Sequence, residues 1–184
     1  MLYNDDSSLD AVASMLLEGK VGVIPADTVY GLSSLADRSG GDRIYEIKMR
    51  PKSKSFIMLA GLSWLKSSPL VVPQVLYEHW PCPLTAIVRN EEDGSTQAVR
   101  VPADPFIQAL VDKTGPIWST SCNISGQPCL MTYDEILPVF GDLVDFIVRK
   151  REEDVNALPS TLIDCTVEPY RVIRQGAYDV KDLI

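Results

Sequence analysis

Two cations separated by one residue, Lys48 and Arg50, are followed directly by Pro51. On an uninterrupted helix, residues two apart point to different sides, so these two charges could not reach one ligand. Proline disfavours the helical conformation for the residue before it, which predicts that the helix ends near Lys48 and that the chain turns there. An arginine fork and a compact lysine charge together suit a triphosphate. The alternative is a solvated basic loop that also contains Lys52 and Lys54.

A group of small and hydroxyl residues follows the short apolar run 21–25, which reads as a buried strand. Its sequence is Pro-Ala-Asp-Thr-Val-Tyr-Gly-Leu over residues 25–32. The hydroxyl of Thr28 can both donate and accept a hydrogen bond, as a zwitterionic amino acid requires. Thr28 is therefore a candidate ligand contact, and a turn or helix-cap role is the alternative.

The run Ser-Thr-Ser-Cys-Asn-Ile-Ser-Gly over residues 119–126 follows the apolar pair Ile117 and Trp118. Its hydroxyls and its amide at Asn123 are neutral donors for phosphate or carboxylate oxygens. Turns rich in such residues are common, so a structural loop is the alternative. Closer to the C-terminal end, Arg174 lies in an apolar run beside Gly176, where a cation and a close backbone approach suit a ligand. An exposed strand arginine is the alternative there.

The elements that would position these residues follow from hydrophobic periodicity and from glycine and proline breaks. Helices are predicted over residues 8–19, 42–48, 62–66, 72–80, 105–113 and 133–140. Strands are predicted over residues 21–25, 56–60, 84–89, 97–101, 117–121, 146–149, 161–165 and 170–174. Helices and strands interleave throughout, which predicts an α/β fold with a mixed sheet. We expect one domain over residues 1–184, because 184 residues with 46% hydrophobic content suit a single core.

Composition excludes several classes of protein. The formal net charge of −8 argues against extensive gripping of a phosphate polymer, so any polyanion site must be local. No apolar run approaches the roughly 18 residues that cross a bilayer, and we expect a cytoplasmic protein without membrane contact. The four cysteines have no metal-ligand spacing, so no metal site is expected. The single histidine, His79, has the neighbours of a helix surface, which argues against Ser-His or Cys-His catalysis.

Seven stretches taken together resemble the successive signatures of the YrdC/TsaC family, in that family's order and spacing. They lie at residues 25–32, 48–51, 80–85, 98–102, 119–126, 159–161 and 173–176. The resemblance covers about residues 8 to 176, and it is specific because all seven occur in order. It implies a twisted open sheet with flanking helices, whose concave face forms a basic cleft. It also implies synthesis of L-threonylcarbamoyladenylate from L-threonine, bicarbonate or CO2, and ATP, with release of pyrophosphate, for modification of tRNA adenosine.

The same resemblance implies roles for individual residues. The implied catalytic set is Lys48, Arg50, Ser121 and Asn123. The implied ATP contacts are Arg50, Lys54, Thr96, Ser121 and Arg174. The implied threonine contacts are Thr28, Arg100, Ser119 and Ser160. ATP would be a substrate that brings its own Mg²⁺, and the product would pass to a TsaD-type transferase complex, with tRNA contact left open.

Some positions depart from the family's pattern, and other functions remain open. Ala26, Cys82 and Cys122 stand where threonine, glycine and alanine are usual, while Leu59 replaces a histidine and gives an apolar wall. The role of Cys129, which falls near ATP in the family, is open. The alternative functions are an RNA-binding module that uses the same cleft, a paralogue without synthase activity, and carbamoyl transfer within a larger maturation enzyme.

Overall fold

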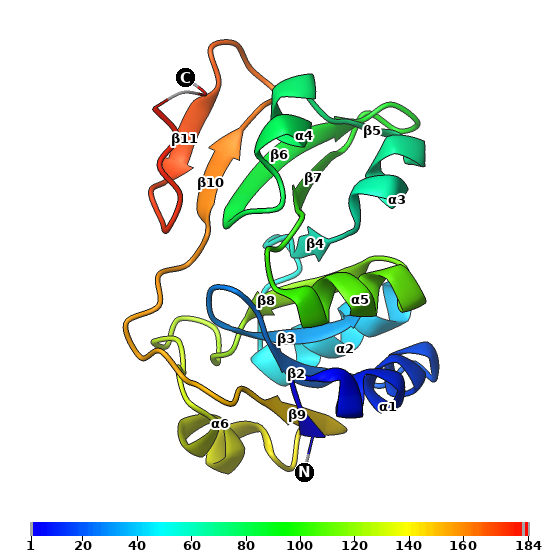
Figure 1. The fold of residues 1–184 in the computed structure, drawn as a ribbon, viewed down its shortest axis with the longest axis vertical. Coiled ribbons are helices and arrows are strands. Elements are labelled where there is room, and N and C mark those ends of the chain that lie inside the picture. Colours follow the sequence, from blue (N-terminus) through cyan, green and yellow to red (C-terminus); the bar gives the residue numbers. More distant parts are fainter. Residues whose placement is uncertain (1, 182, 184) are drawn as a thin grey trace.

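The computed structural model describes residues 2–181 and 183, in which helices and strands alternate along the chain (Figure 1). The strands are β1 (Leu2–Tyr3), β2 (Gly22–Pro25), β3 (Tyr30–Leu35), β4 (Ile57–Leu59), β5 (Leu70–Val71), β6 (Leu84–Asn90), β7 (Thr96–Arg100), β8 (Ile117–Ser121), β9 (Phe146–Arg149), β10 (Thr161–Asp164) and β11 (Arg171–Arg174). The helices are α1 (Asp6–Leu17), α2 (Arg38–Lys48), α3 (Leu62–Ser67), α4 (Gln74–His79), α5 (Pro105–Thr114) and α6 (Tyr133–Phe140).

The strands form one mixed sheet in the order β1-β9-β2-β3-β8-β4-β7-β6-β10-β11, with β5 added beside β6. Parallel pairs such as β2 with β9 and β6 with β10 alternate with antiparallel pairs such as β3 with β8 and β6 with β7. The predicted α/β class and mixed sheet are confirmed.

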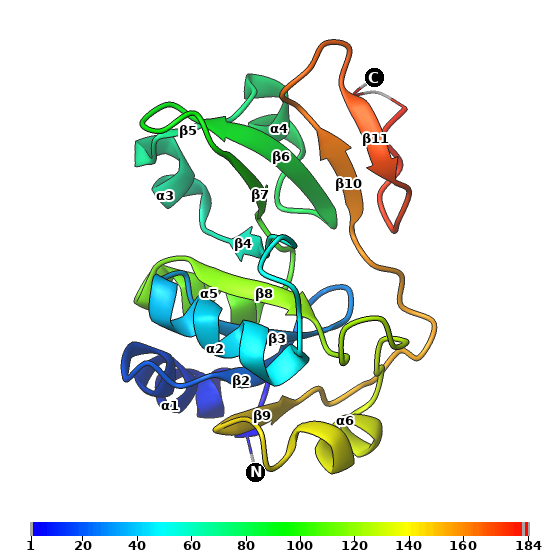
Figure 2. The same ribbon diagram turned by 180° about the vertical axis from the view of Figure 1, so that it is seen from behind.

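The sheet has two halves joined through the short central strand β4 (Figures 1 and 2). The half that contains β2, β3 and β8 has α1 and α5 on one face and α2 on the other. Strand β2 is buried on both faces, because Ile24 packs in the cluster beneath α1 and α5 while Val23 packs in the cluster beneath α2. This double burial explains its continuous apolar sequence.

The other half, formed by β5, β6, β7, β10 and β11, has a core on one face only. Helices α3 and α4 contribute Leu65 and Leu76 to that core, and β6 contributes Ala86 and Val88. Successive strand residues face opposite sides of a sheet, so Ile87 points away from the core. The other face of this half therefore lines a cleft, to which Ile87, Ala98 and Leu162 contribute.

Strand β3 and the start of α2 differ from the sequence prediction. Residues 30–35 form a buried central strand, whereas the sequence analysis predicts no strand there, because the serines and the glycine hide the strand pattern. Helix α2 begins at Arg38 rather than Asp42, since the Asp37 side chain accepts from the Gly40 N–H at 2.7 Å and caps the helix. None of the helices in the described residues has the length and apolar composition to cross a membrane.

Candidate active site

A cleft of about 360 Å³ lies where the two halves of the sheet meet. Three arginines enter it from different elements: Arg50 after α2, Arg100 at the end of β7, and Arg174 at the end of β11. The serine and threonine residues of its lining are Thr28, Ser55, Ser119, Thr120, Ser121 and Ser160. Its apolar residues include Ile57, Leu59, Ile87, Ala98 and Leu162. Among the described residues that line it there is no carboxylate, so the opening favours anions.

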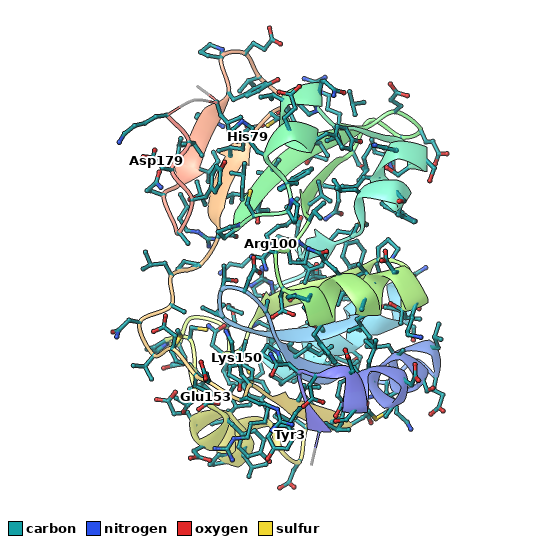
Figure 3. The ribbon with its side chains drawn as sticks, in the orientation of Figure 1. Tyr3, His79, Arg100, Lys150, Glu153 and Asp179 are labelled. Carbon is teal, nitrogen blue, oxygen red and sulfur yellow. The ribbon has the colours of Figure 1, made fainter. Side chains whose placement is uncertain are left out.

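Arg100 lies at the centre of the molecule, at the level where the two halves meet (Figure 3), and it is only 4% exposed. Its Nη2 pairs with Asp27 Oδ1 at 2.9 Å, and its Nη1 donates to Thr28 Oγ1 at 3.1 Å. Burial lowers the pKa of this arginine, but a guanidinium keeps its charge in proteins. Its Nε is buried and has no hydrogen-bond partner in the described part of the chain. A buried donor without a partner is costly, so this nitrogen marks the place of an acceptor on a ligand.

Arg174 and Ser160 form the wall opposite the β2–β3 loop. Nη2 of Arg174 donates to the Ser160 carbonyl at 2.8 Å, and the Ser160 hydroxyl lies 2.8 Å from the hydroxyl of Thr85. Gly176 makes this arrangement possible, because a Cβ at that position would lie 2.2 Å from the carbonyl oxygen of Pro159. The glycine beside Arg174 is thus required by a close backbone approach.

The linker between β9 and β10 carries Ser160 from one half of the sheet to the other and is fixed at its start. The hydroxyl of Tyr30 donates to Glu153 Oε1 at 2.8 Å and accepts the Lys150 N–H at 2.8 Å. Lys150 and Glu153 lie in the half of the molecule below Arg100 (Figure 3). The main chain at Tyr133 also donates to Glu153, so β3, α6 and the linker are held together.

The β3–β8 pair places two serines at the cleft. Gly31 lies opposite Ser121 and Ser33 lies opposite Ser119 in the antiparallel register. A Cβ at Gly31 would lie 2.3 Å from the Ser119 hydroxyl oxygen, so glycine opens the space for that side chain. The Ser121 hydroxyl donates to Asn123 Oδ1 at 2.7 Å, which leaves its lone pairs free toward the cleft.

The turn after α2 directs Arg50 into the cleft. Helix α2 ends at Lys48 as predicted, and Met49 follows in the left-handed conformation at φ 51°. The N–H of Arg50 bonds back to the Tyr45 carbonyl, which closes a Schellman-type end. The guanidinium then donates to the carbonyls of Lys54 and Ser55, which fixes its direction.

Lys48 lies behind the cleft rather than in it, with 0% of the residue exposed. Its ammonium donates to the carbonyl of Ser121, to the carbonyl of Asn123 at 2.7 Å and to Asn123 Oδ1 at 2.9 Å. These three bonds use all three donors of a lysine. The sequence predicts that Lys48 contacts a triphosphate. In the structure its ammonium instead donates to the loop of residues 121–123.

The family model for Sua5, YciO and YrdC proteins, described as telomere recombination, matches residues 14–176. The chain belongs to the Sua5/YciO/YrdC family. The threonylcarbamoyl-AMP synthase of Vibrio cholerae is 32% identical over 188 residues, which cover 92% of this chain and 97% of that relative. The synthase of Pyrococcus abyssi is 29% identical over 186 residues, which cover 93% of this chain and 54% of that relative. The chain therefore spans about half the length of the Pyrococcus protein.

Solved Sua5/YciO/YrdC structures share the fold. The crystal structure of P. abyssi Sua5 complexed with L-threonine has a TM-score of 0.87 and 28% identity, and the match covers 97% of this chain and 56% of that one. Escherichia coli YciO has a TM-score of 0.84 and 26% identity, with 98% and 94% covered. The predicted family and its twisted open sheet are confirmed by these matches.

The expected family site residues fall into two groups by position. The residues that line the cleft are Thr28, Arg50, Arg100, Ser119, Ser121, Ser160 and Arg174. The residues outside its lining are Lys48, Lys54, Thr96, Asn123 and Cys129. Of the second group, Lys48 and Asn123 are bonded to each other beneath the loop. Lys54 contributes a carbonyl to Arg50, and Thr96 is exposed at the start of β7.

Two polar residues of the site went unassigned from sequence. Asp27 is the ion-pair partner of Arg100, and Thr85 is the hydrogen-bond partner of Ser160. Both lie within the stretches that resemble the family's signatures. For Asp27, the available signal was its place directly beside Thr28, a candidate ligand contact. In the described residues, no group of three or more His, Cys, Asp or Glu side chains is placed to hold a metal ion.

Proposed function

We propose that this chain makes L-threonylcarbamoyladenylate from L-threonine, bicarbonate or CO2, and ATP, releasing pyrophosphate. The observation that carries the proposal is the buried Nε of Arg100, which has no hydrogen-bond partner among the described residues and would be satisfied by an amino-acid carboxylate. The names of the relatives support the same activity. Arg100 and Thr28 would hold the threonine carboxylate, with Ser119 and Ser160 nearby in the same cleft.

Arg50 and Arg174 would receive the triphosphate. Neither forms an ion pair with a carboxylate in the described part of the chain, and each still has unused guanidinium donors. Burial lowers the pKa of both arginines without removing their charge. Because none of the described residues that line the cleft is a carboxylate, the Mg²⁺ that comes with ATP would be held by phosphates and water, as is usual for this ion.

The chemistry needs no covalent intermediate with the protein. The threonine amine attacks the carbon of CO2, or of bicarbonate with loss of water, and gives a carbamate. The carbamate oxygen attacks the α-phosphorus of ATP, and the bond to the β-phosphate oxygen breaks to release pyrophosphate. The residues of the cleft contribute by holding three reactants together and by placing fixed positive charge where negative charge develops.

The product would serve tRNA modification in the cytoplasm. An acyl-adenylate is hydrolytically labile, so we propose that it passes to a TsaD-type transferase complex. Direct tRNA contact would be confined to the neighbourhood of the basic 48–54 segment, because the net charge of −8 opposes a broad interface.

The test is incubation of the protein with ATP, bicarbonate and one amino acid at a time, with pyrophosphate release as the measurement. Release that depends on both threonine and bicarbonate supports the proposal. Arg50→Ala is the variant for the nucleotide side, because its guanidinium bonds only the carbonyls of Lys54 and Ser55 among the described residues. It should raise KM for ATP tenfold or more while KM for threonine stays within twofold. Pyrophosphate release without threonine, or none at all, would favour a binding module or an inactive paralogue.

A further inference from the structure

We propose that Asp27 is a positioning residue, which sets the Arg100 guanidinium at the angle that receives the amino-acid carboxylate. The inference rests on the proposed function, since it assigns a role within the threonine half of the same cleft. Asp27 lies in the loop between β2 and β3, and its side chain is 12% exposed. It is 73 residues from Arg100 in sequence.

Both carboxylate oxygens of Asp27 are committed. Oδ1 accepts from Arg100 Nη2 at 2.9 Å, and Oδ2 accepts from the Ala103 N–H at 3.0 Å. The second bond anchors the carboxylate to the main chain just before α5, where Asp104 caps the helix by accepting from the Ile107 N–H. The carboxylate is thus held at both oxygens, and Arg100 is aligned on a fixed acceptor.

This alignment decides which donors of Arg100 are left for a ligand. A guanidinium has five N–H donors, and Asp27 and Thr28 each receive one of them. The Nε–H is buried and finds no acceptor within residues 2–181 and 183. Together with an adjacent Nη hydrogen it forms a side-on fork that matches the two oxygens of a carboxylate. Thr28 accepts from Arg100, so its own hydroxyl proton stays free to donate to the ligand.

The negative charge of Asp27 also acts against binding of the substrate carboxylate for which Asp27 positions Arg100. It partly neutralises Arg100 and would repel a substrate carboxylate, so a purely electrostatic account predicts tighter threonine binding when the charge is removed. Positioning predicts the opposite. Asparagine would offer one oxygen, which can replace one of the two acceptors, and one N–H₂ group, which only donates and can accept from neither Arg100 nor Ala103. The two accounts therefore differ in the sign of the effect.

The experiment compares Asp27→Asn, Asp27→Glu and Asp164→Asn in the full chain. Asp164 is the matched control, because its side chain is also 12% exposed and pairs with an arginine, Arg171, outside the lining of the cleft. Calorimetric titration of L-threonine gives its Kd without turnover, and steady-state pyrophosphate release gives KM for threonine and for ATP. Thermal melting of each variant reports whether the fold is retained.

We expect Asp27→Asn to raise the threonine Kd and KM at least tenfold, with the ATP KM within twofold of wild type. Asp27→Glu keeps the charge but moves it by one methylene, so it should melt closer to the wild type than Asp27→Asn does, without restoring threonine affinity. Asp164→Asn should leave all three constants unchanged. Unchanged or tighter threonine binding in Asp27→Asn, or full recovery by Asp27→Glu, overturns the inference.

Failure of the proposed function gives a different result. Wild-type protein that binds threonine but releases no pyrophosphate refutes the synthase assignment, while the titrations of the variants still decide the role of Asp27. Wild-type protein that binds no threonine refutes the positioning role as well.

Discussion

Replacing Lys48 with methionine tests whether this lysine holds the 121–123 loop or binds the triphosphate. Methionine keeps much of the length and apolar volume of lysine but removes the ammonium, so the loop loses the bonds to the Ser121 carbonyl and to both oxygens of Asn123. A hydrogen bond to a charged group contributes about 1.5–3 kcal/mol. Burial works against the ammonium and lowers the pKa of Lys48 to about 8.

The magnitude follows from these opposing effects. The lowered pKa corresponds to a net cost of roughly 3 kcal/mol for the charged over the neutral form of Lys48, so the stabilisation comes from its hydrogen bonds to the loop rather than from the charge. Removing the lysine also leaves buried carbonyl groups without a donor, which costs free energy on its own. We expect Lys48→Met to lower the free energy of unfolding by about 3 kcal/mol, and the Tm by about 6–12 °C for a chain of this length. Activity should fall as well, because the Ser121 hydroxyl depends on the same loop.

The assay is urea denaturation together with pyrophosphate release, and Lys52→Met is the matched control. Lys52 lies in the same basic segment, but its side chain is 72% exposed and pairs with Asp42 at the surface. An exposed pair contributes little, so the control should unfold like the wild type. A Lys48→Met protein that unfolds like the wild type yet loses activity tenfold or more would refute the structural role and return Lys48 to the triphosphate.

Four further predictions concern the cleft and its supports. Arg100→Lys should weaken L-threonine binding tenfold or more by calorimetry and leave ATP binding within twofold, because lysine lacks the two-point fork. Gly176→Ala should lower the free energy of unfolding by about 1–3 kcal/mol in urea, since its Cβ would meet the main chain at Pro159. Serine should have a kcat/KM about 10–200-fold below that of threonine, because it leaves empty the space that a methyl group fills beside Leu59. In the folded protein Lys48 loses its proton near pH 8, but in the unfolded chain only near 10.5, so its contribution to stability should rise between these values. Urea titrations of wild type and Lys48→Met across that range measure the difference.

Local signals in the sequence determined much of the fold. The bounds of β8, α6 and β9 are those expected, because each is a short apolar or amphipathic run between clear turn residues. The end of α2 was also predictable, since Pro51 acts on its immediate neighbour. Strand β3 was not predictable in this way. Its burial comes from α2 and from the neighbouring strands, and three of its six residues are Gly or Ser, which strands disfavour or do not prefer.

The residues of the cleft also divide into those that the local sequence predicts and those whose contacts depend on the fold. Residue types indicated that Thr28, Ser119 and Arg174 could contact a ligand, and all three line the cleft. The sequence did not reveal the partners of the cations, because 73 residues separate Asp27 from Arg100 and 75 separate Lys48 from Asn123. Only the folded sheet brings these groups together. An unassigned acid in a signature stretch is therefore better treated as a candidate partner for a distant cation than as surface charge.

The number of unused hydrogen-bond donors distinguishes a cation that holds the site together from one that can bind a ligand. The three donors of Lys48 already have three acceptors, so we expect this lysine to hold the loop rather than to bind a substrate. Arg50 gives two of its five donors to carbonyls, and Arg100 gives one each to Asp27 and Thr28. Both arginines line the cleft and keep unused donors, which a bidentate anion can use. In a lysine and arginine pair at spacing two, the lysine can therefore stabilise the loop while the arginine binds the ligand.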